Sequence, residues 1–149
     1  MTFREIMSMT KDLQLIWRQH PSKEYSDRQY LDYTISGQPL REYLGVKSKS
    51  SVTPFGFFQS KAEQKRILKE FRLQQKTQLV GDRIELYICE CCGDIACGAL
   101  TSKIIDNGNK IIWTHFANQN DPDEIGEELQ VEQIEFDRQN YFKAFLNID

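Results

Sequence analysis

Apolar residues recur at three- and four-residue intervals in three parts of the chain, the spacing that builds one buried face of an α-helix. Near the N-terminus, residues 2–18 combine this spacing with a Thr-x-x-Glu start, which is typical of a capped helix. In the middle, residues 60–75 begin with a serine that can cap a helix. A third helix is predicted after Asp137, another good cap. The expected apolar positions of the last two helices are Ile67, Leu68, Phe71, Tyr141, Phe142, Phe145 and Leu146.

Alternating apolar and polar residues predict strands between these helices. The last two strands flank Asn107 and Gly108, and Asn-Gly is among the strongest short signals for a β-hairpin. One helical turn is predicted from Pro39 to Leu44. Since no strand–helix–strand alternation is present, the pattern predicts an α+β fold with a mainly antiparallel sheet and helices near the N-terminus, in the middle and at the C-terminus. The predicted strands cover residues 30–35, 83–89, 99–105 and 110–116.

Length and composition indicate a single domain over residues 1–149. The chain is 40% hydrophobic and 28% charged, which suffices for a packed core without a disulfide or a structural metal. No apolar run has the length of a membrane-spanning helix, and the N-terminus lacks the apolar stretch of a secretory signal. We therefore expect a cytoplasmic protein that needs no cofactor and binds no membrane.

The two signs of charge are separated along the chain. The formal net charge is -3, but residues 1–117 carry a net charge of +4 and residues 118–149 a net charge of -7. Residues 118–135, called the acidic segment below, hold seven carboxylates and no basic side chain. Such a block of like charge repels itself and weakens the compact state unless something compensates it.

A charge run is usually a solvated loop, but apolar residues are spaced among these carboxylates. Apolar side chains ringed by one sign of charge suit a surface that docks onto a partner of the opposite sign. The acidic segment is therefore a candidate interface for a basic protein, with Ile125 and Leu129 as apolar anchors. The full set of predicted partner-binding residues is Asp121, Asp123, Glu124, Ile125, Glu127, Glu128, Leu129 and Glu132.

A cluster of cysteines offers a second chemistry. Cys89, Cys92 and Cys97 lie within nine residues, and with His115 they could supply the sulfur and imidazole ligands that zinc prefers. Structural zinc sites usually draw on two separated ligand pairs, whereas this chain has one pair and a stray cysteine. Cysteine is also a common small core residue, so packing is the favoured interpretation and no metal ligand is assigned.

Other catalytic and binding chemistries find less support. Only His20 and His115 supply imidazoles, and His20, beside a proline, is expected to be solvated. No nucleophile elbow, zinc-protease or phosphate-binding motif is present, so no catalytic residue is assigned. The basic residues of positions 61–76 could contact phosphates, but two glutamates interrupt them and the pI is about 5.5. We therefore expect no nucleic-acid binding.

Several motifs resemble those of a group of small bacterial proteins. From Cys92 to Thr101 the chain reads Cys-Gly-Asp-x-x-Cys-Gly-Ala-x-Thr. A strand with Trp113, the acidic stretch, and a Phe-Asp-Arg-x-x-Tyr motif that ends at Tyr141 then follow in order. Upstream, an Ile-x-Gly-x-Pro-Leu-Arg-Glu segment starts at Ile35. The resemblance covers most of residues 30–146.

This family is often labelled oxidoreductase, and it includes immunity proteins of contact-dependent growth inhibition and related polymorphic toxin systems. The resemblance implies a small, acidic cytoplasmic protein that binds the C-terminal domain of a cognate toxin in a one-to-one complex. Together with the acidic segment, it predicts a non-enzymatic inhibitor that covers the active site of a basic nuclease. The alternative is a small zinc- or thiol-dependent enzyme centred on the cluster from Cys89 to Cys97.

Overall fold

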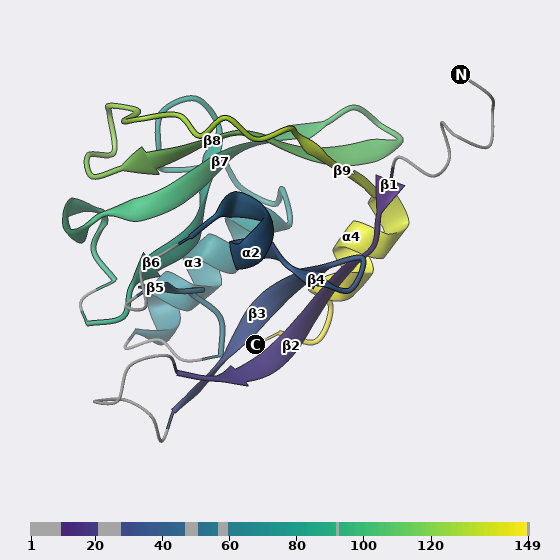
Figure 1. Cartoon of the computed structure of the whole chain (residues 1–149), viewed down its shortest axis with the longest axis horizontal. Helices are drawn as coiled ribbons and strands as arrows, with labels where there is room; N and C mark the ends of the chain where they lie inside the picture. The colour runs from purple at the N-terminus through teal and green to yellow at the C-terminus, as the bar shows by residue number, and fades with distance from the viewer. Residues whose placement is uncertain (1–9, 21–27, 47–50, 57–59, 92, 149) are drawn as a thin grey trace.

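The computed structural model describes residues 10–20, 28–46, 51–56, 60–91 and 93–148. It is an α+β fold in which two sheets and two longer helices enclose one core (Figure 1). The strands are β1 (Thr10–Lys11), β2 (Leu13–Gln19), β3 (Gln29–Ile35), β4 (Gln38–Pro39), β5 (Ser51–Val52), β6 (Arg83–Cys89), β7 (Ala99–Asp106), β8 (Lys110–Gln119) and β9 (Ile134–Asp137). The helices are α2 (Leu40–Leu44), α3 (Lys61–Phe71) and α4 (Arg138–Ala144), with a 3-10 turn, η2, at Ile95–Cys97.

The larger sheet has the strand order β1-β9-β8-β7-β6-β5. Only the short β1–β9 pair is parallel, and every other neighbouring pair is antiparallel. The β7–β8 hairpin turns at the predicted position, where Gly108 has a φ of 95° and its amide donates to the Asp106 carboxylate at 2.8 Å. A glycine suits this left-handed backbone because a Cβ would strain it.

The smaller sheet, β2-β3-β4, is joined to the larger one by aromatic side chains. The Tyr33 ring of β3 lies 5.6 Å from that of Tyr87 on β6 and 5.5 Å from that of Trp113 on β8, in both cases edge to face. Its hydroxyl donates to the Leu86 carbonyl oxygen at 2.9 Å. Because this buried hydroxyl has an acceptor, the tyrosine can span the core without an unpaired polar atom.

Helices α3 and α4 close the core, and both start with the predicted caps. The Ser60 hydroxyl accepts a bond from the Glu63 amide at 3.3 Å, and the Asp137 carboxylate accepts one from the Asn140 amide at 3.0 Å. Tyr141 of α4 donates to a carbonyl oxygen of α3 at 2.8 Å. The first two bonds fix the starts of the helices, and the third holds α4 against α3.

The predicted N-terminal helix is wrong over residues 10–18, which form β1 and most of β2, whereas residues 2–9 lie outside the described residues. In β2, Leu13 is buried and Leu15 partly buried, while Gln14 and Ile16 face solvent. This alternation is that of a strand paired with β3. Helix α3 ends at Phe71, four residues earlier than predicted.

The exposed side of the C-terminal helix also differs from the prediction, because Leu146 faces solvent. Its neighbours Tyr141 and Phe145 are fully buried, as expected. Within the described ranges, no helix is long and apolar enough to cross a bilayer.

Candidate functional site

Between β8 and β9, residues 120–133 of the acidic segment run along the outer edge of β8. β9 pairs only with the first half of β8, and beyond it the segment itself takes the edge position. The Asn118 amide donates to the Glu127 carbonyl oxygen at 2.9 Å, and the Leu129 amide donates to the Phe116 carbonyl oxygen at 2.7 Å. Because these bonds attach its backbone to the sheet, the side chains of the segment project from a backbone that is held in place at the sheet edge.

The turn of the acidic segment is also attached to the loop after α3. The Val80 amide donates to the Pro122 carbonyl oxygen at 2.9 Å. The side chain of Ile125 lies over the same loop, because a Cβ built on Gly81 would be 3.8 Å from its Cδ1 atom. Two segments far apart in the sequence therefore meet at the surface.

This meeting point carries an apolar patch. Ile125 is 49% exposed and Val80 is 43% exposed, so together they offer apolar area that a partner could cover. Leu129, the other predicted anchor, is partly buried and packs against the core. Val80 lies outside the acidic segment and carries no charge, so no signal in the sequence points to it; only the fold brings its loop next to Ile125.

Most carboxylates around this patch are not neutralised. Within the part of the chain that the structure describes, the side chains of Asp123, Glu124, Glu127 and Glu132 make neither an ion pair nor a hydrogen bond. Glu128 is paired with His115, whose Nδ1 atom lies 2.7 Å from its Oε1 atom. Of the predicted partner-binding residues, Asp121 and Leu129 are partly exposed, and the others face solvent: Asp123, Glu124, Ile125, Glu127, Glu128 and Glu132.

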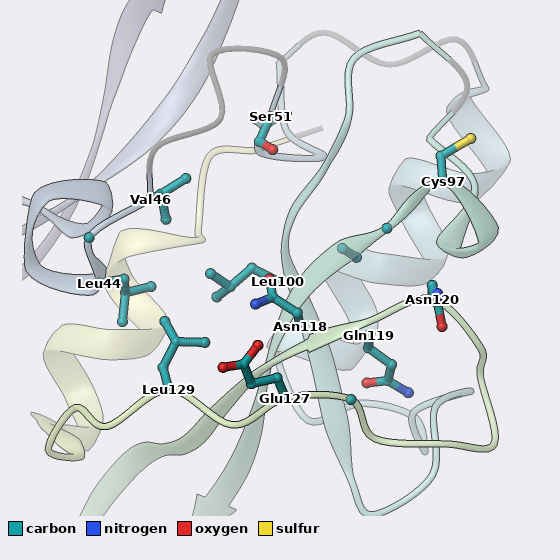
Figure 2. A pocket seen from close by; sticks show the side chains of 14 residues that line it. Leu44, Val46, Ser51, Cys97, Leu100, Asn118, Gln119, Asn120, Glu127 and Leu129 are labelled. Carbon is teal, nitrogen blue, oxygen red and sulfur yellow. The ribbon is translucent and has the colours of Figure 1, made fainter.

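A groove of about 680 Å³ adjoins the segment on the side of α2. Figure 2 shows the Glu127 carboxylate and the Asn118 amide beside it, with Leu44, Leu100 and Leu129 around them. A smaller hollow of about 300 Å³ shares four of its lining residues and continues toward Val131. The remaining labelled residues of the groove are Val46, Ser51, Cys97, Gln119 and Asn120.

A buried arginine supports the sheet beneath the segment. Arg83 donates from Nε to the Thr101 hydroxyl at 3.0 Å, from Nη2 to the Thr101 carbonyl oxygen at 3.0 Å, and also to the His115 carbonyl oxygen. His115 sits in a bulge of β8 with a φ of 51°. Burial lowers the pKa of the Arg83 guanidinium, and the nearby Glu128 carboxylate acts in the opposite direction. The arginine thus holds the bulge through the His115 carbonyl oxygen, and the side chain of the same histidine pairs with Glu128 of the acidic segment.

His20 is buried, contrary to the prediction of a solvated side chain. Its Nδ1 atom lies 2.9 Å from the Glu90 carboxylate, which is also buried. Burial lowers the pKa of His20, partly offset by Glu90. The proline that follows His20 suggested an exposed chain end, but the pairing of β2 with β3 carries the imidazole inward.

The cysteine cluster lies at the end of β6. Cys89 is partly buried and Cys91 and Cys97 are exposed, while Cys92 is outside the described residues. The described residues include no group of three His, Cys, Asp or Glu side chains arranged to hold a metal ion. Since Cys92, one of the possible ligands, lies outside the described residues, the zinc site stays an alternative beside the favoured interpretation, packing. His115, the fourth proposed ligand, is instead paired with Glu128.

The basic stretch on α3 is partly neutralised within the chain. Arg66 pairs with Glu63 at 2.7 Å, with Glu70 at 2.6 Å and with Glu85 at 3.3 Å. Burial raises the pKa of the Glu70 and Glu85 carboxyls, and Arg66 acts against this shift. An arginine held by three carboxylates is not available for phosphate contacts, whereas the expectation of no nucleic-acid binding stays a prediction.

No protein-family model, curated protein or solved structure matches this chain.

Proposed function

We propose that the protein is a non-enzymatic immunity protein that acts in the cytoplasm. It binds the C-terminal domain of a cognate toxin in a one-to-one complex and neutralises it. One observation carries the proposal: exposed carboxylates without ion partners, including Asp123, Glu124 and Glu127, share the acidic segment with the exposed Ile125, whose side chain lies over the loop that carries the exposed Val80. The resemblance to toxin-immunity proteins over residues 30–146 supports the same function.

The unpaired carboxylates of the acidic segment lower the stability of the folded chain unless positive charges compensate them. Like charges held close together at the edge of a sheet repel one another and destabilise the folded chain. Among the described residues, a fixed positive charge pairs with only one carboxylate of the segment, that of Glu135 at its end, which lies 3.1 Å from the Lys110 ammonium; Glu128 pairs with the His115 imidazole, which is a cation only when protonated. A basic partner would neutralise the other carboxylates. The repulsion among them would then be relieved on binding, which favours the complex.

The chemistry of the surface favours a nuclease as the partner. Nuclease active sites are lined with Lys and Arg side chains that hold phosphate groups. Carboxylates presented from a rigid sheet edge can occupy those phosphate positions and exclude RNA or DNA. The exposed Ile125 and Val80 would add the apolar centre that interfaces generally need for affinity.

The direct test is co-expression with the C-terminal domain of the large protein encoded next to this chain. Expression of that domain alone should arrest growth, and co-expression of this protein should restore it. The pair should then purify as a stable one-to-one complex in high salt. A neighbouring domain that is not toxic, or toxicity that this protein does not relieve, would contradict the immunity function.

A matched pair of variants tests the acidic surface itself. Asp123→Asn removes an unpaired carboxylate beside the apolar patch, whereas Asp12→Asn removes an exposed one ahead of β2, outside the acidic segment. Asp123→Asn should slow association and weaken binding by up to about fivefold, with a shallower salt dependence. Asp12→Asn should change neither. Equal behaviour of the two variants would mean that the partner binds elsewhere, even if growth is rescued.

A further inference from the structure

We propose that the groove between α2 and the acidic segment receives a basic side chain of the partner, preferably an arginine. This inference rests on the proposed function and specifies the chemistry of the contact. The groove holds about 680 Å³ and continues into a hollow of about 300 Å³. Binding cavities for small ligands begin at about 300 Å³, so the groove has enough room to receive one amino-acid side chain.

Several separate parts of the fold form the groove. Leu44 comes from the end of α2, Leu100 from the start of β7, and Asn118 from the end of β8. Glu127 and Leu129 come from the acidic segment. The backbone bond between Asn118 and Glu127, at 2.9 Å, fixes the segment against β8, so the polar and apolar sides keep their relative positions.

The lining matches the two parts of an arginine or lysine side chain. Such a side chain buries its methylene stem on apolar surface and keeps its charged end in a polar setting. The partly exposed Leu129 provides most of the apolar contact, to which the largely buried Leu44 and Leu100 add the small surface that they leave open to the groove. The Glu127 carboxylate and the Asn118 amide lie next to them (Figure 2). None of the residues that line either hollow is a lysine or an arginine.

The charge at this position selects a cation. Among the described residues, no side chain pairs with the Glu127 carboxylate, although it stands beside the apolar surface of the groove. The planar guanidinium of an arginine can form two parallel N–H···O bonds to the two carboxylate oxygens, a geometry that the single nitrogen of a lysine ammonium does not offer. Arginine is therefore the preferred occupant.

A titration of the full-length, isotope-labelled protein followed by NMR tests the proposal without the toxin. The probe is a blocked tri-arginine peptide, and its neutral isostere, a tri-citrulline peptide, is the control. The tri-arginine peptide should shift the methyl signals of Leu44, Leu100 and Leu129 and the side-chain amide of Asn118. The tri-citrulline peptide should leave these signals in place.

Two substitutions in the acidic segment separate the groove from general attraction. Glu127→Gln keeps the shape of the side chain and should weaken tri-arginine binding by about fivefold. Glu124→Gln removes the same charge from the same segment outside the lining, and it should weaken binding less than about twofold. Both residues are exposed, so we expect the two variants to fold equally well.

Several results would overturn the proposal. Equal losses in the two variants would mean diffuse attraction to the segment, which refutes the groove but leaves the acidic surface intact. Unmoved groove signals, or equal binding of the citrulline peptide, would refute cation recognition there. Growth rescue by co-expression is an independent test, so failure of the proposed function would be seen separately.

Discussion

Gly126 lies so close to the carbonyl oxygen of Asn118 that a Cβ at position 126 would be 2.2 Å from that oxygen. The approach is a consequence of the neighbouring bond, in which the Asn118 amide donates to the Glu127 carbonyl oxygen at 2.9 Å. No side chain fits between two backbones at this distance. The glycine therefore allows the acidic segment to lie along β8.

Gly126→Ala should detach this part of the segment from the sheet. Because the added methyl group contacts backbone, which cannot rotate away, the Asn118–Glu127 bond must lengthen or break. We expect hydrogen exchange of the Asn118 and Leu129 amides to rise by about tenfold or more, since local opening then costs less free energy. Partner affinity should fall because the carboxylates lose their fixed positions.

Gly37→Ala is the matched control for this variant. A Cβ there meets no atom within 4 Å, and the change is strained only because φ is +87°. It should lower the overall free energy of unfolding by about 1 kcal/mol, with no selective effect on Asn118 and Leu129. Equal exchange profiles in the two variants would show that the close approach at Gly126 does not hold the segment.

The elements that could be predicted from the sequence are those with local signals. The β7–β8 hairpin follows from Asn107 and Gly108, and the starts of α3 and α4 follow from their capping residues. β2 was missed because Leu13, Ile16 and Trp17 fit helical spacing, while only Leu13 and Leu15 indicate alternation. Pairing with β3 favours the strand over the helix. The residues of β3 lie further along the chain, so the local pattern of residues 13–19 does not reveal this pairing.

Of the candidate site, only the negative charge could be predicted from the sequence. The acidic segment is visible in the composition, whereas Val80 and the groove are assembled from α2, the loop after α3, β7 and β8. Arg83 and His20 were missed for a related reason. Polar residue types are expected at the surface, and only the folded chain shows the acceptors that permit their burial.

Arg83→Met should destabilise the protein strongly. The methionine can fill the space, but it leaves the Thr101 and His115 carbonyl oxygens without their buried donor. An unsatisfied buried polar group costs about 1–3 kcal/mol, so we expect a total loss of about 2–4 kcal/mol in urea unfolding. The bulge at His115 should also become more mobile.

Arg138→Met is the comparison for the buried arginine. Arg138 is 46% exposed and pairs with Asp106 at 3.3 Å on the surface. An exposed pair contributes less than about 1 kcal/mol, so this substitution should have a small effect. A loss for Arg83→Met no larger than that for Arg138→Met would show that the hydrogen bonds of the buried guanidinium contribute little.

His20 should make stability fall as the pH decreases below about 6.5, its ordinary pKa. Burial lowers the pKa of His20 in the folded chain, with Glu90 opposing the shift, so the unfolded chain binds a proton first. The stabilisation by neutral His20 is therefore complete above the unfolded pKa and is lost as the pH falls toward the folded one. Urea unfolding between pH 7.5 and about pH 5 measures this loss.

Replacement of each histidine in turn identifies the source of this dependence. His20→Gln should flatten the decline in stability, since the protein then has no buried imidazole to protonate. His115→Gln changes a side chain that is 61% exposed, and it should leave the decline nearly unchanged. A decline that survives in His20→Gln would assign the pH dependence to another group.

Ile125→Ser and Val80→Ser should weaken partner binding while leaving the fold intact. Both side chains are more than two-fifths exposed, so each substitution should change the free energy of unfolding by no more than about 0.5 kcal/mol. An apolar side chain at the centre of an interface contributes more than one at its rim, and its removal can cost about tenfold or more in affinity. Leu146→Ser is the control, because Leu146 is 67% exposed but follows α4 near the C-terminus. If all three variants bound the toxin domain like the parent in calorimetry, the apolar patch would lie outside the interface, and the acidic segment would have to act through charge alone.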